Sequence, residues 1–214
     1  MKALPRNSVE AGISVKFMIW VFFFVSIMGA ASSQEKRLLY QVTKNGTVIG
    51  SMQLAELTFP DKVVVKLDSK IKTHNLFSVS VLTREETVFQ NGMITYSSIY
   101  RNLNGDEKEN KQLKVSASNY KIEKGNKTEM LNFYPIKHNM LSLYFSEPVH
   151  IPKLYSDNLQ EFLDIKKLAP DQYQVTFPNG NYNLFFYKDG ICQKINVHHS
   201  LYNVEIILKD IIYL

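Results

Sequence analysis

The stretch FPNGNYNLFFYKDGICQKINV (177–197) decides the fold that the sequence predicts for this chain of 214 residues. Its dipeptides Asn179-Gly180 and Asp189-Gly190 accept a positive φ at little cost and favour the tight turns of β-hairpins. Between and after them, apolar residues recur at every second position, which is the period of a half-buried strand. The stretch therefore predicts antiparallel strands that follow one another through short turns.

The same pattern extends over most of the chain. Asn-Gly dipeptides recur at 45–46, 91–92 and 104–105, each between runs that alternate apolar and polar residues. We count about a dozen predicted strands, and Gly50 within one of them indicates a bulge or close packing. A flat sheet of that width would leave long open edges, so we expect the sheet to curl. The predicted fold is all-β: a single curved antiparallel sheet, a half-barrel or open barrel, formed by one domain over residues 34–214.

One segment breaks the period of two. In HNMLSLYFSEPVHIP (138–152), Met140, Leu141, Tyr144 and Phe145 recur at helical spacing, and Pro148 ends the pattern. A helix of about ten residues is marginal in water by itself, so it needs packing against other elements. We expect residues 138–145, called the plug below, to form one short helix that lies in the concave face of the sheet.

The N-terminus has the features of a secretory signal peptide. Basic residues precede the uncharged run 17–31, in which Gly29 and Ala31 fit a small-residue cleavage site. The run is shorter than the roughly 20 apolar residues of a spanning helix. We therefore predict a cleaved signal peptide over residues 1–31 and an exported protein with no stable membrane span after cleavage. An uncleaved anchor is the alternative.

Charge and cysteine content exclude several classes of protein. Removal of the signal peptide takes away three basic side chains and one acidic one, so the formal net charge of +5 falls by two. The lysines are interspersed with acids, as in NGDEKENKQLK (104–114), whereas nucleic-acid binding needs a concentrated basic surface. Because Cys192 is the one cysteine, an intramolecular disulfide and a CxxC site are excluded. We predict a mixed-charge surface, no nucleic-acid partner, and Cys192 buried on a strand.

No motif indicates nucleophilic catalysis or metal binding. The sequence has no G-x-S-x-G elbow, and Ser142, His138 and Glu147 are too close in sequence to form a productive triad. His198 and His199 are consecutive at the end of a predicted strand, so their rings point to opposite faces and cannot both hold one ion.

Paired carboxylates are the remaining route to catalysis. Glu147 and Asp157 flank the plug, which makes them candidates for a hydrolytic pair. Asp157 belongs to YSDN (155–158), however, and the local hydrogen bonds of Asp and Asn in a turn explain it better. We predict no catalytic residue, no metal site and no cofactor.

Aromatic residues give the one indication of a binding site. In a small closed structure the aromatic residues of the plug and the C-terminal strands fill the core. In a wider structure they line an apolar cavity. We favour the filled core and keep the cavity as the alternative. The candidate ligand-binding residues, on the plug and the concave face, are Met140, Tyr144, Phe145, Tyr173, Phe177, Tyr182 and Phe186.

Several segments resemble one family in their order and spacing: YQVTKNGTVIG (40–50), PIKHNMLSLYFSEP (135–148), LYSDNLQEFLDI (154–165), the opening stretch (177–197) and LYNVEIILK (201–209). The chain is similar to an uncharacterised exported family, a domain of unknown function, from Gram-negative bacteria of the Bacteroidota type. It resembles more loosely the exported half-barrel domains of unknown function that surround one short helix. The resemblance implies an all-β fold and a location in the periplasm or outer envelope, and it implies no catalytic residue.

Three hypotheses on function follow, in this order. The first is a non-enzymatic cell-envelope protein that binds or carries a lipid or other apolar ligand, or an envelope protein. The second is a structural or assembly factor whose exposed β edge receives a strand from a partner. The third is an enzyme with an unrecognised site, which requires a polar pocket with several convergent ionisable groups.

Overall fold

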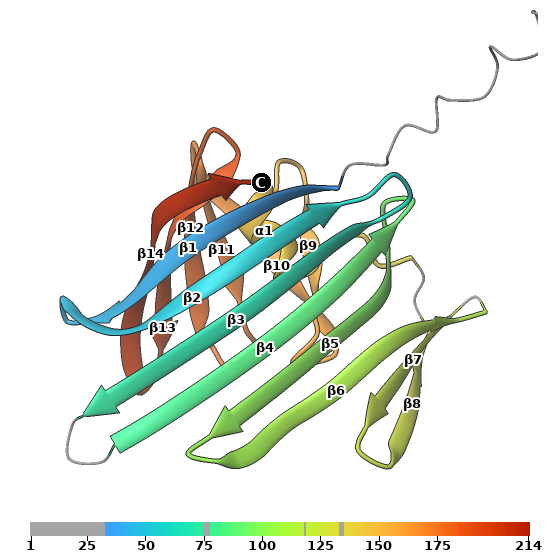
Figure 1. Cartoon of the computed structure of the whole chain (residues 1–214), viewed down its shortest axis with the longest axis horizontal. Coiled ribbons are helices and arrows are strands. Elements are labelled where there is room, and N and C mark those ends of the chain that lie inside the picture. Colours follow the sequence, from blue (N-terminus) through green and yellow to red (C-terminus); the bar gives the residue numbers. More distant parts are fainter. Residues whose placement is uncertain (1–32, 75–77, 118, 133–134) are drawn as a thin grey trace, which may run out of the picture. The chain divides into compact units, whose positions relative to one another are not determined.

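Figure 1 shows a computed structural model of the protein, which describes residues 33–74, 78–117, 119–132 and 135–214. The predicted signal peptide, residues 1–31, lies outside the described residues and stays a prediction. The one helix of the described chain is α1 (Ser142–Phe145). The strands are β1 (Gln34–Lys44), β2 (Thr47–Thr58), β3 (Val63–His74), β4 (Ser78–Gln90), β5 (Met93–Leu103), β6 (Asp106–Ser116), β7 (Asn119–Lys124), β8 (Lys127–Leu131), β9 (Lys153–Ser156), β10 (Glu161–Ala169), β11 (Gln172–Thr176), β12 (Tyr182–Lys188), β13 (Ile191–His199) and β14 (Tyr202–Tyr213).

The predicted turns at 45–46, 91–92, 104–105 and 189–190 have both residues at positive φ, whereas at 179–180 only Gly180 does, in a longer connection between β11 and β12. Asn45 and Gly46, between β1 and β2, have φ angles of 50° and 77°. Asp189 and Gly190, between β12 and β13, have φ angles of 52° and 77°. Two successive residues at positive φ define the tight turn whose twist matches that of the flanking strands. These turns therefore fix the hairpins of the sheet.

All strands belong to one 14-stranded sheet in which the paired strands are antiparallel. Strands that follow one another in the sequence lie side by side, except β8 and β9. In addition β1 pairs with β14, which joins the N-terminal and C-terminal halves. β8 and β9 form the two ends of the order, so the sheet does not close into a barrel. The predicted single antiparallel sheet of about a dozen strands is confirmed.

The sheet curves around the plug. Figure 1 shows β1–β6 in front of β9–β13, with α1 between them. One cluster of buried side chains joins the two halves to the plug; it includes Leu38, Tyr40, Leu54, Leu141, Leu143, Tyr144, Phe145, Val175, Phe185, Cys192 and Ile195. A common core on both sides of the helix requires a concave sheet face. The predicted helix in the concave face is therefore confirmed.

The helix is shorter than the sequence predicts. Helical structure covers residues 142–145, whereas the prediction began at His138. Asn139 lies in the turn before the helix, where its side-chain oxygen and its carbonyl each accept from Ser142 N over 3.2 Å. His138 before it lies outside the helix, and its carbonyl accepts from Tyr155 N over 2.9 Å. The helix ends at Phe145 because Ser146 is extended, with φ −146° and ψ 128°.

The chain that leads into the plug, including its first two residues, bridges two strands that are distant in the sheet order. Ile94 N of β5 donates to Ile136 O over 2.8 Å, and Tyr155 N of β9 donates to His138 O over 2.9 Å. We call residues 136–139 the strap. Tyr120 supports it, since the Tyr120 hydroxyl donates to Ile94 O over 2.7 Å and accepts from Ile136 N over 3.1 Å. The strap thus covers part of the edge of β9 and connects it to β5.

Gly50 lies close to the backbone of β3. A Cβ atom at Gly50 would lie 2.4 Å from Lys70 O and 2.8 Å from Ile71 Cα, both backbone atoms. The ladder between β1 and β2 also changes register between Val42 and Thr43, opposite this position. Bulge and close packing, the two interpretations given by the sequence, are both present at Gly50.

Candidate functional site

The apolar interior of the sheet is interrupted by a carboxylate. Leu38, Leu54 and Leu67 lie opposite one another across β1, β2 and β3. Leu67 lies opposite Glu85 of β4, and Glu85 opposite Ile99 of β5. Residues that are directly opposite in a ladder point to the same face. Glu85 therefore points to the concave face, in a row whose other four members are buried leucine and isoleucine.

Arg101 lies diagonally across from Glu85 on the same face. Arg101 pairs with Thr83, and Ile99, two residues earlier, pairs with Glu85. Diagonal neighbours across two antiparallel strands are within reach of long side chains. Among the described residues, however, neither the Glu85 side chain nor the Arg101 side chain has a hydrogen bond or an ion pair. An acceptor and a donor thus lie near each other without bonding to each other.

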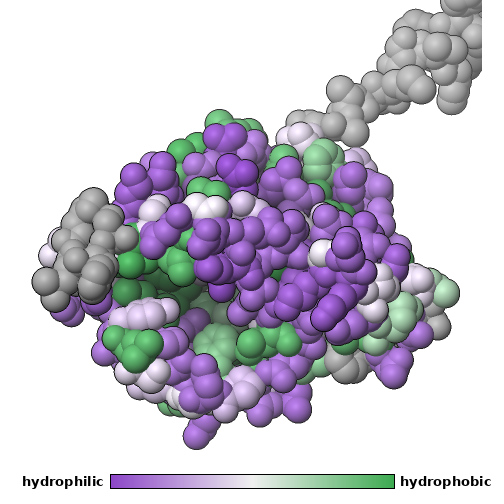
Figure 2. All heavy atoms as spheres, turned by 90° about the horizontal axis from the view of Figure 1, so that it is seen from below, coloured by the Kyte–Doolittle hydropathy of each residue, from purple (hydrophilic) through white to green (hydrophobic). Residues whose placement is uncertain are grey.

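A cavity of about 630 Å³ lies between the plug and this face. Its apolar lining consists of Leu67, Ile99, Met140, Leu141, Tyr144, Leu159, Phe177, Pro178, Val197 and Tyr202. Its polar lining consists of Glu85, Arg101, Ser156, Asp157, Asn158, Glu161, Asn179, Asn181, Asn183, His198 and His199. Figure 2 shows a hollow in the lower face, with hydrophobic side chains inside it and mainly hydrophilic ones around it. The concave face is therefore partly filled core and partly open cavity. From the sequence we favoured a filled core and kept the cavity as the alternative.

Asp157 is fixed by hydrogen bonds from two elements. It lies in the turn after β9, as predicted for YSDN. Ser97 of β5 donates to Asp157 Oδ1, and Asn139 Nδ2 donates to Asp157 Oδ2 over 2.8 Å. Burial raises the pKa of Asp157, and the hydrogen bonds from Ser97 and Asn139 oppose that rise. Both carboxylate oxygens are thus occupied before any ligand arrives.

Glu85 has a different electrostatic environment. Burial and, as a smaller cause, the negative charge of Asp157 raise the pKa of Glu85 to about 7, against the positive charge of Arg101, which lowers it. The side chain is deep in the protein yet retains accessible surface, because it lines the cavity. At neutral pH this carboxyl group is therefore close to half-protonated and open to a ligand.

A buried lysine connects β6 to the same turn. Lys111 is 8% exposed, and its Nζ donates to Asn158 O over 2.7 Å. Lys111 Nζ also lies 2.7 Å from Glu109 Oε2, so the ammonium group is neutralised by a partner on its own strand. The turn after β9 is thus held against β5 and β6 by side chains, since β9 and β6 do not pair in the sheet.

Three of the predicted ligand-binding residues line the cavity: Met140, Tyr144 and Phe177. Phe145 and Tyr173 are buried in the core, and the Tyr173 hydroxyl donates to Glu147 Oε1 over 2.5 Å. Ligand binding by any of these residues stays a prediction.

Tyr182 and Phe186 lie on the other side of β12 from its core residues. Phe185 and Tyr187 are the buried residues of this strand, 1% and 6% exposed. Lys194 lies over the Phe186 ring at 5.2 Å, and the Tyr182 ring stacks on His198. The sequence missed this orientation because both faces of β12 carry aromatic residues.

The other candidates from the sequence have structural partners. Ser142 Oγ donates to Asn139 O over 2.7 Å, and Glu147 pairs with Tyr173 instead of Asp157. His198 stacks on Tyr182, and the His199 ring stacks on Tyr202 at 4.5 Å. No group of three or more His, Cys, Asp or Glu side chains in the described ranges has a geometry that could hold a metal ion.

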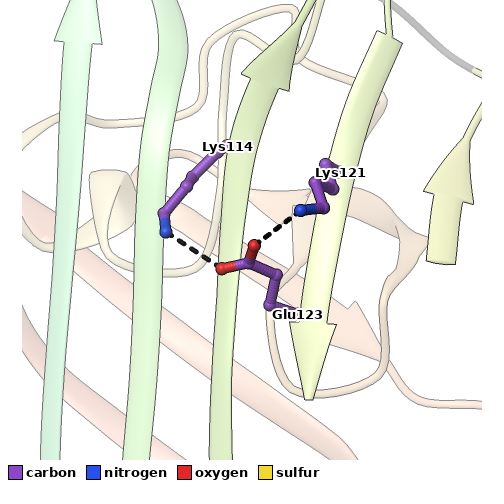
Figure 3. A network of polar contacts seen from close by, with 3 residues as sticks. All are labelled: Lys114, Lys121 and Glu123. Carbon is purple, nitrogen blue, oxygen red and sulfur yellow. Dashed lines mark hydrogen bonds and ion pairs between the residues drawn. The ribbon is translucent and has the colours of Figure 1, made fainter. Parts of the chain in front are cut away.

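The outer surface of the sheet carries mixed charge, as predicted. Figure 3 shows Glu123 of β7 between Lys114 of β6 and Lys121 of β7. Lys121 Nζ donates to Glu123 Oε1 over 2.8 Å and Lys114 Nζ to Glu123 Oε2 over 2.9 Å. These hydrogen bonds lower the pKa of Glu123 to about 2. In the part of the chain that the structure describes, no helix has the length and apolar character needed to cross a membrane.

Comparisons with known proteins agree with this fold. Residues 40–209 match the sequence model of a family described as "Domain of unknown function (DUF6134)". Among solved structures, the chain is similar to the crystal structure of a beta-barrel-like protein of domain of unknown function DUF1849 from Brucella abortus. The TM-score is 0.55 at 9% identity, and the match covers 84% of this chain and 98% of that one. At this identity the likeness shows the fold alone. No curated protein matches the chain.

Proposed function

The chain belongs to the family described as Domain of unknown function (DUF6134), and we propose that it is an exported cell-envelope protein that binds an amphiphilic ligand without catalysis. The cavity between the plug and the concave face is the observation that carries this proposal. Its volume of about 630 Å³ lies within the roughly 300–1,000 Å³ of small-molecule sites. The Bacteroidota-type origin and the location in the envelope are part of the proposal, on the resemblance and the signal-peptide pattern alone.

The cavity has both apolar and polar lining residues, which favours an amphiphile over a purely apolar ligand. Met140 and Tyr144 of the plug, with Leu67 and Ile99 of the sheet, offer an apolar surface for a hydrocarbon chain. Glu85 next to them would lose its contact with water if a hydrocarbon filled the whole cavity, at a cost in free energy. A ligand with one polar end avoids that cost.

The hydrogen bonds of the polar lining residues favour binding over catalysis. Ser156 is the one serine, threonine or cysteine among the described lining residues, and its hydroxyl oxygen accepts from Leu159 N over 3.3 Å. Nucleophilic catalysis needs a base hydrogen-bonded to the nucleophile. Asp157, next to Ser156 in the sequence, already accepts hydrogen bonds from Ser97 and Asn139. The convergent groups Glu85, Asp157 and Arg101 keep an enzyme as the third candidate.

The exposed-edge function is the second candidate, and the sheet gives it one site. β8 pairs with β7 alone among the described strands, and four of its five residues are exposed. Its Lys127 and Glu129 are charged, and short charged edge strands discourage strand addition. The edge of β9 is partly covered by the strap. The cavity is therefore the better-supported site.

The test is whether a neutral amphiphile, decan-1-ol, binds to the protein. Binding is measured by the change in the thermal unfolding temperature. Native mass spectrometry after mild extraction from the envelope gives a second reading, because a bound natural ligand adds its mass. We expect decan-1-ol to raise the unfolding temperature of the wild type, as any ligand that binds only the folded state does.

Two blocking variants locate the binding. Val197→Trp and Met140→Phe add side-chain volume to the cavity lining and should abolish the decan-1-ol effect. Val48→Trp, at a site that is 53% exposed, is the matched control and should retain it. Equal stabilisation of the wild type and of both blocking variants would place binding elsewhere and refute the proposal.

A further inference from the structure

We propose that the cavity selects amphiphiles with a cationic head group. Glu85 is the counter-ion of that head group, and the positive charge of Arg101 weakens the preference for a cation. The inference rests on the proposed function and names the ligand class of the same site. It predicts that an alkylamine binds more tightly than an alcohol or a carboxylate with the same chain.

Two carboxylates of the cavity lining, Glu85 and Glu161, have no hydrogen bond or ion pair among the described side chains, and Glu85 is the one that lies between Leu67 and Ile99 on the concave face. Both oxygens of Asp157 already accept hydrogen bonds, from Ser97 and from Asn139. Lys111, behind the turn, is committed to Glu109 and to Asn158 O. Glu85 has no hydrogen-bond donor and no ion-pair partner among the described residues. A buried carboxylate without a partner is unfavourable, and a ligand ammonium group supplies the missing one.

The charge balance of the lining favours a cation. Three carboxylates, Glu85, Asp157 and Glu161, line the cavity with one guanidinium group, Arg101. An added carboxylate on a ligand would increase the excess of negative charge, whereas an ammonium group reduces it. The pKa of Glu85 is raised mainly by burial, and the negative charge of Asp157 adds to that rise.

The position of Glu85 also fits an amphiphile. Its direct neighbours across the sheet are Leu67 and Ile99, so the carboxylate is flanked by apolar side chains on both adjacent strands. Met140 and Tyr144 of the plug contribute to the lining of the same space. An ammonium group at Glu85 therefore leaves its hydrocarbon chain next to apolar surface.

Ion-pair formation at Glu85 is linked to protons. At pH 7 the carboxyl group holds part of a proton, which it must release to pair with an ammonium group. Alkylamines are protonated at this pH, as lysine is. Binding of an amine should therefore release a fraction of a proton from the protein, and binding of an alcohol should not.

The experiment is calorimetric titration with decylamine, decan-1-ol and decanoate, each below its micellar concentration. The variants are Glu85→Gln and Arg101→Gln, and the matched control is Glu86→Gln, the neighbour that pairs with Lys66 over 3.4 Å. Each titration is repeated in two buffers of different ionisation enthalpy, which measures proton release. Because two independent variants are used, one that fails to fold leaves the other as a test.

We expect the wild type to bind decylamine on the order of 10-fold to 100-fold more tightly than decan-1-ol, the range of a charge-assisted contact. Glu85→Gln should remove that preference and the proton release while retaining decan-1-ol. Arg101→Gln should tighten decylamine several-fold by removing a like charge, and Glu86→Gln should change nothing.

Three results overturn the inference in distinguishable ways. Equal affinities for decylamine and decan-1-ol in the wild type show that charge is not recognised, and the proposed function survives. Preference for decanoate, lost in Arg101→Gln, shows that Arg101 selects an anion instead. Absence of binding by all three amphiphiles removes the proposed function itself.

Discussion

Asn139 of the plug donates from Nδ2 to Asp157 Oδ2 over 2.8 Å, and the same nitrogen donates to Thr87 Oγ1 of β4 over 2.8 Å. Asn139 is fully buried, with no exposed surface. One side chain thereby connects the plug, the turn after β9 and the N-terminal half of the sheet. Residues of the plug and of this part of the sheet line the cavity together, so the connection fixes two of its walls relative to each other.

Substitution of Asn139 by alanine should destabilise the protein by about 3 kcal/mol, because it leaves Thr87 and Asp157 buried without their donor. Urea unfolding followed by circular dichroism measures the change. Asn126, in the exposed turn between β7 and β8, is the matched site, and Asn126→Ala should stay within about 0.5 kcal/mol of the wild type. Equal effects at the two asparagines would show that Asn139 does not hold the plug.

Glu85 should make the stability of the protein depend on pH. Its pKa is about 7 in the folded protein and 4.5 as the reference value, so between these limits the folded state binds a proton that the unfolded state has released. The stability that this bound proton contributes to the folded state is fully present below pH 4.5 and is lost as the pH rises through 7. Glu85→Gln removes the effect and should be more stable than the wild type at pH 8, by at most ~3 kcal/mol, with little difference near pH 4.

Chemical unfolding of both proteins at several pH values measures this difference. The pKa of Asp157 is also raised, by burial, and its effect has the same sign in both proteins, so it largely cancels in the comparison. Glu86→Gln, on the opposite face of β4, is the control and should run parallel to the wild type. A Glu85→Gln curve that also runs parallel would mean that Glu85 is not buried in a charged state.

Cys192 should be unreactive in the native protein. It has no exposed surface, and burial raises the pKa of its thiol to about 12, so almost no thiolate is present at pH 8. Ellman's reagent should label no thiol at pH 8 in buffer and one thiol per chain in urea, since the sequence contains one cysteine. Fast native labelling would contradict the packing of Cys192 against the plug.

Gly50→Ala should cost about 2 kcal/mol or more, because the new Cβ would clash with backbone atoms of Lys70 and Ile71 that cannot move without disrupting the ladder of β2 and β3. Ser51→Ala, at the exposed neighbouring position, is the control and should be nearly neutral. Thermal unfolding of the two variants checks the difference. A neutral Gly50→Ala would show that β2 and β3 are less closely packed at this point.

The fold was predictable because its signals are local. Turns such as Asn45-Gly46 and Asp189-Gly190 act within two residues, and the alternation between them defines the strands. The plug was predictable for the same reason, as a change of period. Its shortened helix was not, because Asn139 is recruited by Thr87 and Asp157, which are distant in the sequence.

The site was not predictable, because its key residue lies on a strand without a clear apolar face. In β4, Glu85 alternates with Thr83 and Thr87 on one side, and Arg84 and Glu86 lie on the other. The pattern of that strand alone gives no inward face. The partner strands decide it, since Leu67 and Ile99 set the direction in which Glu85 points. Asp157 was correctly assigned to a turn, yet only the fold brings that turn to β5.

The most direct test of the central claim is the position of a bound amphiphile in a crystal. Soaking with 10-bromodecan-1-ol and collecting anomalous data marks the bromine atom, and the neutral alcohol keeps the result independent of the charge preference. We predict one strong bromine site inside the cavity, near the apolar lining formed by Ile99, Met140 and Val197. A bromine site on the outer surface of the sheet, with the cavity free of ligand density, would contradict the account.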